Sequence, residues 1–324
     1  MGVEVKAIRL VCLACLLITA AAGSAVAEER YAVIVNGATG GEKYAAQQKK
    51  WREDLDAALK KSFLFNASNI VVFSEEGTSS LTPTAENVRG LFADLRRRVT
   101  RDDLLLVVLI GHGNFDGTDA KFNLVGPDLT AREWRGLLDA IPGRSIIVNT
   151  TESSFPFLEE LSRRGRVVIT ATDSPAQRFA TVFPGYFIQA LGNAGSDLDK
   201  NGRVSIWETF RAASAAVKQH YEQLGQLSTE RAIIDDNGDG IGREADDPGP
   251  DGTVAVSVYL DAGPGPVAAD AAIANLYRER ATIEAQLETL KSRRELISPG
   301  EYEAQMEKLL IELARISQRI RQGS

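Results

Sequence analysis

A histidine set between two glycines is the residue of this sequence best suited to acid–base chemistry. His112 is one of two histidines among 324 residues, and it follows directly on the apolar run 104–110. A branched aliphatic run of this length is typical of a strand that is buried on both faces of a sheet. A histidine at the carboxyl end of such a strand is a candidate general base, the alternative being a loop residue without a chemical role.

Residues 197–208 have the spacing of a calcium-binding loop of the EF-hand type. Such a loop supplies oxygen ligands from positions 1, 3, 5, 7, 9 and 12 and has a glycine at position 6, here Gly202. The predicted ligands are the side chains of Asp197, Asp199, Asn201, Ser205 and Glu208 and the backbone carbonyl of Arg203. We therefore expect calcium as a cofactor, the alternative being a solvated acidic turn.

Residues 235–242 repeat the first half of this pattern. The predicted ligands of a second, weaker site are Asp235, Asn237 and Asp239 and the carbonyl of Ile241. Position 12 carries Asp246 instead of a glutamate, and no clear helix follows. Two other interpretations stay open: a glycine-rich polar turn, or a segment that wraps the first calcium loop.

Short apolar runs that alternate with amphipathic segments must position these residues. Strands are predicted at 31–36, 69–73, 104–110, 145–149, 166–171 and 253–260, and helices at 42–62, 84–99, 131–141, 157–163, 181–191 and 206–224. This alternation predicts an α/β fold, with a mostly parallel sheet covered by helices on both faces. Residues that follow neighbouring strands then lie at one edge of the sheet.

The first 27 residues have the pattern of a secretory signal peptide. Basic residues precede a short apolar segment, which ends in Ala25-Val26-Ala27. This pattern predicts cleavage after Ala27 and export to the periplasm or to the outside of the cell. Both cysteines, Cys12 and Cys15, lie in this segment, so the mature chain would contain no thiol. No apolar stretch is long enough for a comfortable transmembrane span.

The C-terminal part is predicted to be a helical hairpin or coiled coil. A Gly-Pro-Gly-Pro linker at 263–267 precedes residues 268–324, in which apolar residues line one side of two charged segments. The turn is expected at Pro299-Gly300, with Ser298 as the N-cap of the second helix. We expect residues 268–324 to mediate self-association or to bind a protein partner. The net charge of −7 argues against a nucleic-acid partner.

The order of these features resembles the caspase-like cysteine peptidases, in particular the legumain-type (peptidase C13-like) branch. The resemblance covers about residues 31–261 and includes Gly37 after the first strand and His112-Gly113 after the third. Within it, residues 166–240 resemble exported bacterial members that carry calcium-type loops. The resemblance implies a caspase-like three-layer sandwich in one domain, residues 28–262. It also implies that His112 acts as base or orienter for a cysteine after the next strand.

The chain departs from this family at the nucleophile. When Ser154 is aligned with the family's serine, Glu152 occupies the cysteine position and Phe155 the glycine position. A carboxylate cannot replace a thiolate in the acyl-enzyme route, so His112 would be a remnant base. Glu152 beside it would favour the protonated imidazole. Ser153 and Ser154 are the alternative nucleophiles, although a serine hydroxyl is harder to activate than a thiol.

Three functions follow as hypotheses. The first is an exported, calcium-binding caspase- or legumain-like pseudopeptidase that acts by protein–protein interaction. The second is an active hydrolase or peptidase that uses His112 with Ser153 or Ser154. The third is a structural, calcium-stabilised component of the cell envelope.

Overall fold

The computed structural model describes residues 28–262, some residues between 276 and 298, and residues 299–322. The predicted signal peptide at 1–27 and the predicted linker at 263–267 lie outside the described residues. Within the described part of the chain, no helix is both long enough and apolar enough to cross a membrane.

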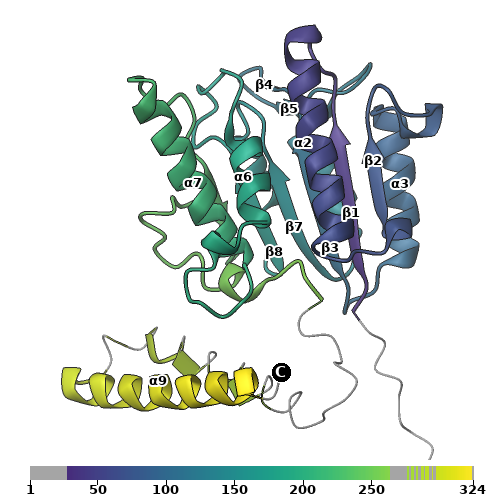
Figure 1. The fold of residues 1–324 in the computed structure, drawn as a ribbon. Coiled ribbons are helices and arrows are strands. Elements are labelled where there is room, and N and C mark those ends of the chain that lie inside the picture. The colour runs from purple at the N-terminus through teal and green to yellow at the C-terminus, as the bar shows by residue number, and fades with distance from the viewer. Residues whose placement is uncertain are drawn as a thin grey trace, which may run out of the picture.

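A six-stranded sheet forms the middle layer of the domain (Figure 1). The strand order is β2-β1-β3-β7-β8-β9, and every neighbouring pair is parallel except the last, in which β9 runs antiparallel to β8. The strands are β1 (Arg30–Asn36), β2 (Ile70–Phe73), β3 (Leu104–Ile110), β7 (Arg144–Asn149), β8 (Arg166–Thr170) and β9 (Ile233–Asp235). The predicted α/β class with a mostly parallel sheet is confirmed.

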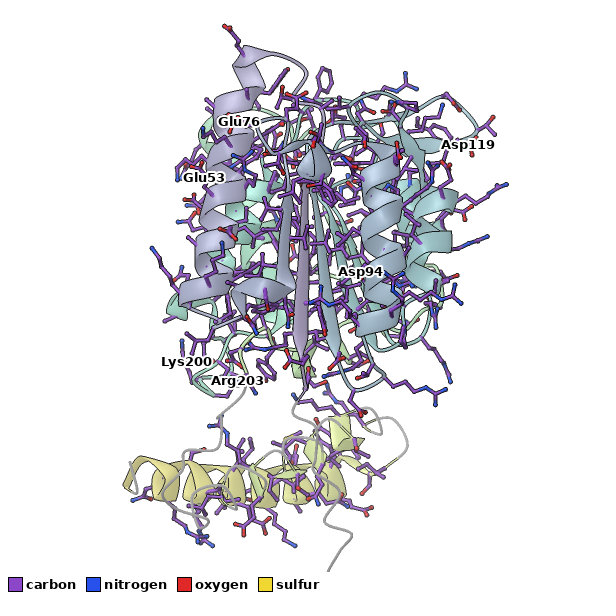
Figure 2. The ribbon with its side chains drawn as sticks, turned by 90° about the vertical axis from the view of Figure 1, so that its right-hand side faces the viewer. Glu53, Glu76, Asp94, Asp119, Lys200 and Arg203 are labelled. Carbon is purple, nitrogen blue, oxygen red and sulfur yellow. The ribbon has the colours of Figure 1, made fainter. Side chains whose placement is uncertain are left out.

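Helices cover both faces of this sheet. One layer contains α2 (Glu42–Lys61), α6 (Phe183–Leu191) and α7 (Ile206–Gln223), and the other contains α3 (Ala85–Arg98), α4 (Ala131–Asp139) and α5 (Phe155–Leu161). In Figure 2, the sheet separates α2, which carries Glu53, from α3, which carries Asp94. The boundaries of all six helices lie within two residues of those predicted, because each helix has a clear apolar face.

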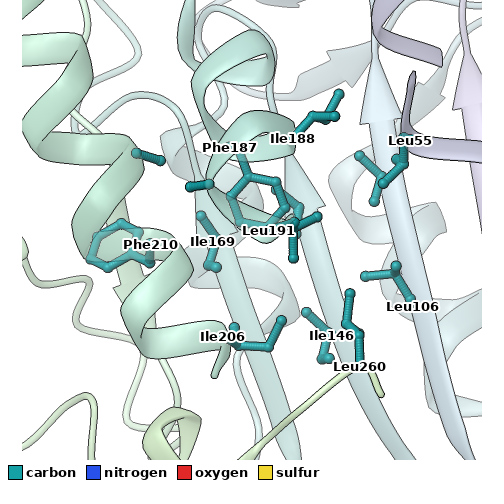
Figure 3. Packing of buried hydrophobic residues seen from close by; sticks show 14 of the residues in the cluster. Leu55, Leu106, Ile146, Ile169, Phe187, Ile188, Leu191, Ile206, Phe210 and Leu260 are labelled. Carbon is teal, nitrogen blue, oxygen red and sulfur yellow. The ribbon is translucent and has the colours of Figure 1, made fainter. Parts of the chain in front are cut away.

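The central strand β3 contributes to both apolar cores, because successive side chains of a strand point to opposite faces. Leu104, Leu106, Val108 and Ile110 pack under α2, α6 and α7, whereas Leu105, Val107 and Leu109 pack under the other layer. Figure 3 shows the first of these cores, with Leu106 and Ile146 facing Phe187 and Leu191 of α6. All seven residues of β3 are buried. The continuous apolar run therefore forms the strand that the two cores share.

A small antiparallel sheet stands where the sequence predicted only a loop. It consists of β4 (Gly113–Phe115), β5 (Ala120–Phe122) and β6 (Leu129–Thr130), in the order β4-β5-β6. Strands of two or three residues are too short to show a periodic pattern. This sheet begins directly after His112, and the carbonyl of His112 accepts a hydrogen bond from the backbone N–H of Asn123 at 3.0 Å. It therefore holds the histidine backbone in place.

The predicted strand at 253–260 is wrong. These residues contain the short 3₁₀ helix η4 (Ala255–Ser257), and Tyr259 makes only an isolated bridge with Ser205. The cause is the buried carboxylate of Asp236, which accepts hydrogen bonds from the N–H groups of Val254 and Ala255. The carboxylate of Asp236 therefore caps the N-terminal end of η4. The last strand of the sheet is β9, which sequence reasoning did not identify.

The C-terminal residues are described separately. Helix α9 (Pro299–Gln322) begins after Ser298, whose hydroxyl accepts a hydrogen bond from the N–H of Glu301, as the capping prediction required. Leu276 packs with Ile316, and Glu279 lies 3.8 Å from Arg319. These contacts join the described residues of the two segments that the sequence predicted to form a hairpin.

Candidate functional site

His112 lies at the carboxyl end of β3, within hydrogen-bond distance of groups from three separate segments. Its Nδ1 atom is 2.9 Å from Oε1 of Glu152. Its Nε2 atom is 3.2 Å from the carbonyl oxygen of Thr39 and 3.3 Å from Nε2 of Gln48. The ring of Tyr44 meets the imidazole edge-on, with 4.7 Å between the centroids. Thr39, Tyr44 and Gln48 were not identified from the sequence, because nothing local in residues 39–48 indicates a partner 64 residues or more away.

The parallel pairing of β3 with β7 explains why His112 and Glu152 meet. Leu109 pairs with Asn149, so the residues that follow the two strands emerge side by side. The loop after β7 is held by two bonds from Thr150, whose N–H and hydroxyl both donate to the carbonyl of Leu109. Gly113 allows this close approach, because a Cβ atom there would lie 2.5 Å from Oγ1 of Thr151 and 2.8 Å from the carbonyl oxygen of Glu152.

The surroundings of His112 and Glu152 favour a protonated imidazole beside the carboxyl group. The side chains of His112 and Glu152 are only 14% and 12% exposed. The hydrogen bond with Glu152 raises the pKa of His112 more than burial lowers it. A protonated imidazole donates from Nδ1 to Glu152 and from Nε2 to the carbonyl of Thr39. In this state the contact with Nε2 of Gln48 is not a hydrogen bond, because both nitrogen atoms are donors. The second carboxylate oxygen of Glu152, Oε2, is buried and has no hydrogen-bond partner within the described part of the chain.

The structure does not bring Ser153 or Ser154 to His112. The hydroxyl of Ser153 donates to the carbonyl of Pro175, and the hydroxyl of Ser154 is bonded to that of Thr172. The two serines are 2% and 0% exposed. Ser153 also has a φ of +52°, a left-handed conformation that side chains rarely adopt. Both alternative nucleophiles are thus bonded to the loop after β8, and neither hydroxyl is hydrogen-bonded to His112.

A pocket of about 330 Å³ opens beside Phe155, the residue at the family's glycine position. It lies between α4, α5 and the β4–β5 hairpin. Its lining combines the aromatic rings of Phe115 and Phe155 with charges of both signs, from Arg132, Arg135, Asp119, Glu159 and Glu160. The sequence did not indicate this pocket, because its walls come from three segments that meet only in the folded chain.

The first calcium-type loop gathers three carboxylates. One oxygen atom from each of Asp197, Asp199 and Glu208 lies within 4.8 Å of the other two. Asp197 accepts hydrogen bonds from the N–H groups of Asn201 and Gly202, and Asp199 accepts two from Asn201, one from its backbone N–H and one from its side-chain amide. Burial and the charge of Glu208 raise the pKa of Asp199 to about 6. Among the described residues, no lysine or arginine side chain lies within 4.0 Å of these carboxylates.

Glu208 closes this loop from the first turn of α7. Its Oε1 atom accepts hydrogen bonds from the N–H groups of Leu198 and Asp199, and its Oε2 atom accepts two from Ser205. Ser205 also caps α7, because its hydroxyl accepts from the N–H of Glu208. Hard oxygen donors on a tight loop without a counter-charge are the donor set that suits calcium. The residues present therefore fit this ion.

Arg203, the predicted carbonyl ligand, uses its side chain elsewhere. The guanidinium group bonds to Asp261 and lies over the ring of Tyr259, 3.7 Å from its centroid. The hydroxyl of Tyr259 accepts a hydrogen bond from Nδ2 of Asn201. We call residues 251–261 the strap, because they run along this loop.

The second loop repeats the hydrogen bonding of the first. Asp235 accepts from the N–H groups of Gly238 and Gly240, both at 2.7 Å. Asn237 accepts from Asp239, and Asp239 accepts from Ile241. The residue at position 12, Asp246, does not close this loop: its side chain is 83% exposed and lies 3.7 Å from Lys218.

The calcium-type loops and His112 lie at opposite ends of the domain. In Figure 2, Lys200 and Arg203 of the first loop are at the lower end, and Asp119 of the β4–β5 hairpin is at the upper end, where β3 terminates. The second loop follows β9, which runs antiparallel to β8 and therefore ends at the lower edge. The chain thus has two separate candidate sites.

Comparisons with known proteins give similarity at low identity only. No protein-family model and no curated protein matches the chain. Similar solved structures include GSU0716 from Geobacter sulfurreducens, with 12% identity, 64% of this chain and 93% of that chain covered, and a TM-score of 0.41. They also include drICE, a caspase, with 11% identity, 64% and 87% coverage and a TM-score of 0.41. The fold described above rests on the strand order of the chain itself.

Proposed function

We propose that this chain is an exported, calcium-binding pseudopeptidase of the caspase-like, legumain-type kind that acts by protein–protein interaction. The observation that carries this proposal is the bond between Nδ1 of His112 and Glu152 at the expected nucleophile position. The imidazole that would serve a thiol in an active member is instead hydrogen-bonded to a carboxyl group.

The chemistry of a carboxylate supports this proposal. The acyl-enzyme route needs a nucleophile that attacks the peptide carbonyl and is later released by water. A carboxylate paired with an imidazolium is a poor nucleophile, and its attack would give a high-energy anhydride. The serine alternative would require Ser153 or Ser154 to break its buried hydrogen bonds and turn toward His112. No contact favours that movement.

Calcium at residues 197–208 is part of the proposal. Asp197, Asp199 and Glu208 would hold the ion, with Asn201 and the carbonyl of Arg203 as further oxygen ligands. The bound ion would supply the positive charge that these carboxylates lack. By holding the first turn of α7, it would stabilise the segment that follows β8 and α6.

The C-terminal residues supply a surface for a partner or a second copy of the chain. Leu310 and Ile311 of α9 are 49% and 43% exposed. Together with Tyr302 and Met306 they line a shallow apolar depression. Apolar side chains exposed on a charged helix support the predicted role of residues 268–324 in association.

A single-cysteine variant tests the site directly. The chain without residues 1–27 contains no cysteine, so Glu152→Cys introduces a unique thiol. If His112 lies in a dyad position, its imidazolium lowers the pKa of this thiol. We expect iodoacetamide to label Glu152→Cys at pH 6 at least about tenfold faster than Glu152→Cys/His112→Ala. Ser80→Cys, on an exposed segment, gives the rate of an ordinary thiol.

The unmodified chain is the second arm of this test. We expect it to leave a peptide library intact and to react with no serine-directed phosphonate probe. Peptide cleavage that is lost in His112→Ala would refute the pseudopeptidase. Labelling of Ser153 or Ser154 would establish the serine alternative.

A further inference from the structure

Helix α9 carries apolar side chains on two of its sides. On one side, Ile316 is 9% exposed and packs with Leu276 and Ile283 of the preceding segment. On another side, Leu310 and Ile311 are largely exposed, and they line a shallow depression together with Tyr302, Met306 and Ala314. A helix of a two-helix hairpin needs only one apolar side. Among the described residues, the second apolar side of α9 is therefore left uncovered.

The uncovered side chains form a row along the helix. Residues four positions apart are neighbours on the surface of an α-helix, so we define the open row as Tyr302, Met306, Leu310 and Ala314. Leu310 lies close to the middle of α9. The charged residues Glu303 and Glu307 border the row. An apolar row with a charged border is the pattern by which one helix packs along another.

The charges of α9 are divided unequally between its two halves. Residues 299–310 contain three glutamates and one lysine, whereas residues 311–322 contain three arginines and one glutamate. Two such helices side by side in the same direction bring like charges and like ends of the helix dipoles together. In opposite directions, each acidic half lies along a basic half. The helix is thus complementary in charge to an antiparallel copy of itself.

We propose that the open row of α9 binds the open row of a second copy of this chain, with the two helices antiparallel. The proposal rests on the proposed role of residues 268–324 in association and names the partner. A two-fold axis near Leu310 brings the two Leu310 side chains together and places Met306 of each copy beside Ala314 of the other. The acidic segment 301–307 of one copy then lies along the segment 313–319 of the other.

Light scattering on the chain that begins at residue 28 tests for the second copy. The unmodified chain should have the mass of two chains. Leu310→Asp/Ile311→Asp places two charges at the centre of the interface, so it should weaken the dimer at least about tenfold. Leu227→Asp is the matched control, because Leu227 is 92% exposed outside α9, and it should keep the mass of two chains. Far-UV circular dichroism shows whether each variant keeps its helix content.

Disulfide formation tests the direction of the two helices. No cysteine follows residue 27, so each introduced thiol is unique. In the antiparallel pair, the two Met306 positions are about 12 Å apart along the helix axis, which is too far for a disulfide. We therefore expect Met306→Cys to form a disulfide with Ala314→Cys in an equal mixture, and neither variant to do so alone. Isotopic labelling of one variant identifies the mixed pair by mass, and Leu310→Cys should link to itself.

Three results would overturn the proposal. A single-chain mass of the unmodified chain at every concentration would leave the open row to a different protein. Dimers of undiminished strength in Leu310→Asp/Ile311→Asp would place the interface elsewhere. Disulfides of Met306→Cys with itself, and none with Ala314→Cys, would show parallel helices. None of these results alters thiol labelling at residue 152, so they are distinguishable from a failure of the pseudopeptidase proposal.

Discussion

His112 and Glu152 form the pair of side chains on which the proposed function rests. A thiol at residue 152 would exchange protons with the imidazole during a reaction, whereas a carboxylate holds the imidazole as a cation. The pair is nearly buried, so its hydrogen bond is shielded from water and contributes to stability. The pKa of His112 therefore indicates whether its hydrogen bond with Glu152 is present.

Replacement of Glu152 by glutamine should therefore destabilise the chain in a pH-dependent way. The pKa of His112 is raised in the folded state, so the stabilisation is fully present below about pH 6.5 and is lost as the pH rises through the folded-state value. We expect Glu152→Gln to lower the free energy of unfolding by about 1–2 kcal/mol at pH 5.5 and by less at pH 9. Urea denaturation measures both values.

The exposed Glu159→Gln is the control for a lost surface charge, and it should change stability little at either pH. An NMR titration of His112 gives a second readout, since its pKa should fall in Glu152→Gln. An unchanged titration curve would show that the two side chains are not coupled in solution.

At the scale of elements, the pairing of β3 with β7 creates the site. The two strands are parallel and in register, so the loops that follow them emerge at the same edge of the sheet. The loop after β7 then packs against Gly113, where there is no room for a Cβ atom. The absence of a side chain at Gly113 thus allows the loop that carries Glu152 to approach His112.

Gly113→Ala should disturb this arrangement. The added methyl group would overlap Thr151 and the backbone of Glu152, so we expect a loss of about 1–3 kcal/mol in the free energy of unfolding, and a lower pKa of His112. Gly136→Ala in α4 is the matched control. No atom lies within 4 Å of its added Cβ, and alanine favours the helix, so its stability should be unchanged or higher by up to about 1 kcal/mol. Equal losses in the two variants would contradict this account.

At the scale of the whole molecule, the domain separates its two candidate sites. His112 lies at the carboxyl edge of the parallel strands, and both calcium-type loops lie at the other end (Figure 2). The strap contacts both loops: Gly252 packs against the ring of Trp207 in the first loop, and Asp251 accepts the N–H of Asp236 in the second. Nothing comparable joins either loop to His112 within the described part of the chain.

Calcium should consequently stabilise the domain without changing the charge of His112. We expect removal of calcium with a chelator to lower the melting temperature while the NMR titration curve of His112 stays the same. Magnesium at the same concentration is the control, because it dehydrates reluctantly and suits such loops less well. A shift in the pKa of His112 on addition of calcium would reveal coupling between the two ends of the sheet.

The sequence alone determined the features that depend on neighbours along the chain. The buried strand at 104–110, the amphipathic helices, the cap at Ser298 and the spacing of residues 197–208 are all local patterns, and each has a local physical cause. The alternation of these elements predicted a mostly parallel sheet, but not the order of its strands. The resemblance to a peptidase family placed Glu152 at the position of the family's cysteine.

Only the tertiary structure decided the features that depend on distant contacts. Residues 253–260 have the alternation of a strand, but the buried carboxylate of Asp236 binds their N–H groups, so they form η4 instead. Ser153 and Ser154 lie beside Glu152 in sequence, yet their hydroxyls are bonded to the loop after β8. Asp251 accepts the N–H of Asp236, 15 residues away, for the same reason: a buried polar group takes the partner that the fold provides, and sequence spacing does not reveal which partner that is.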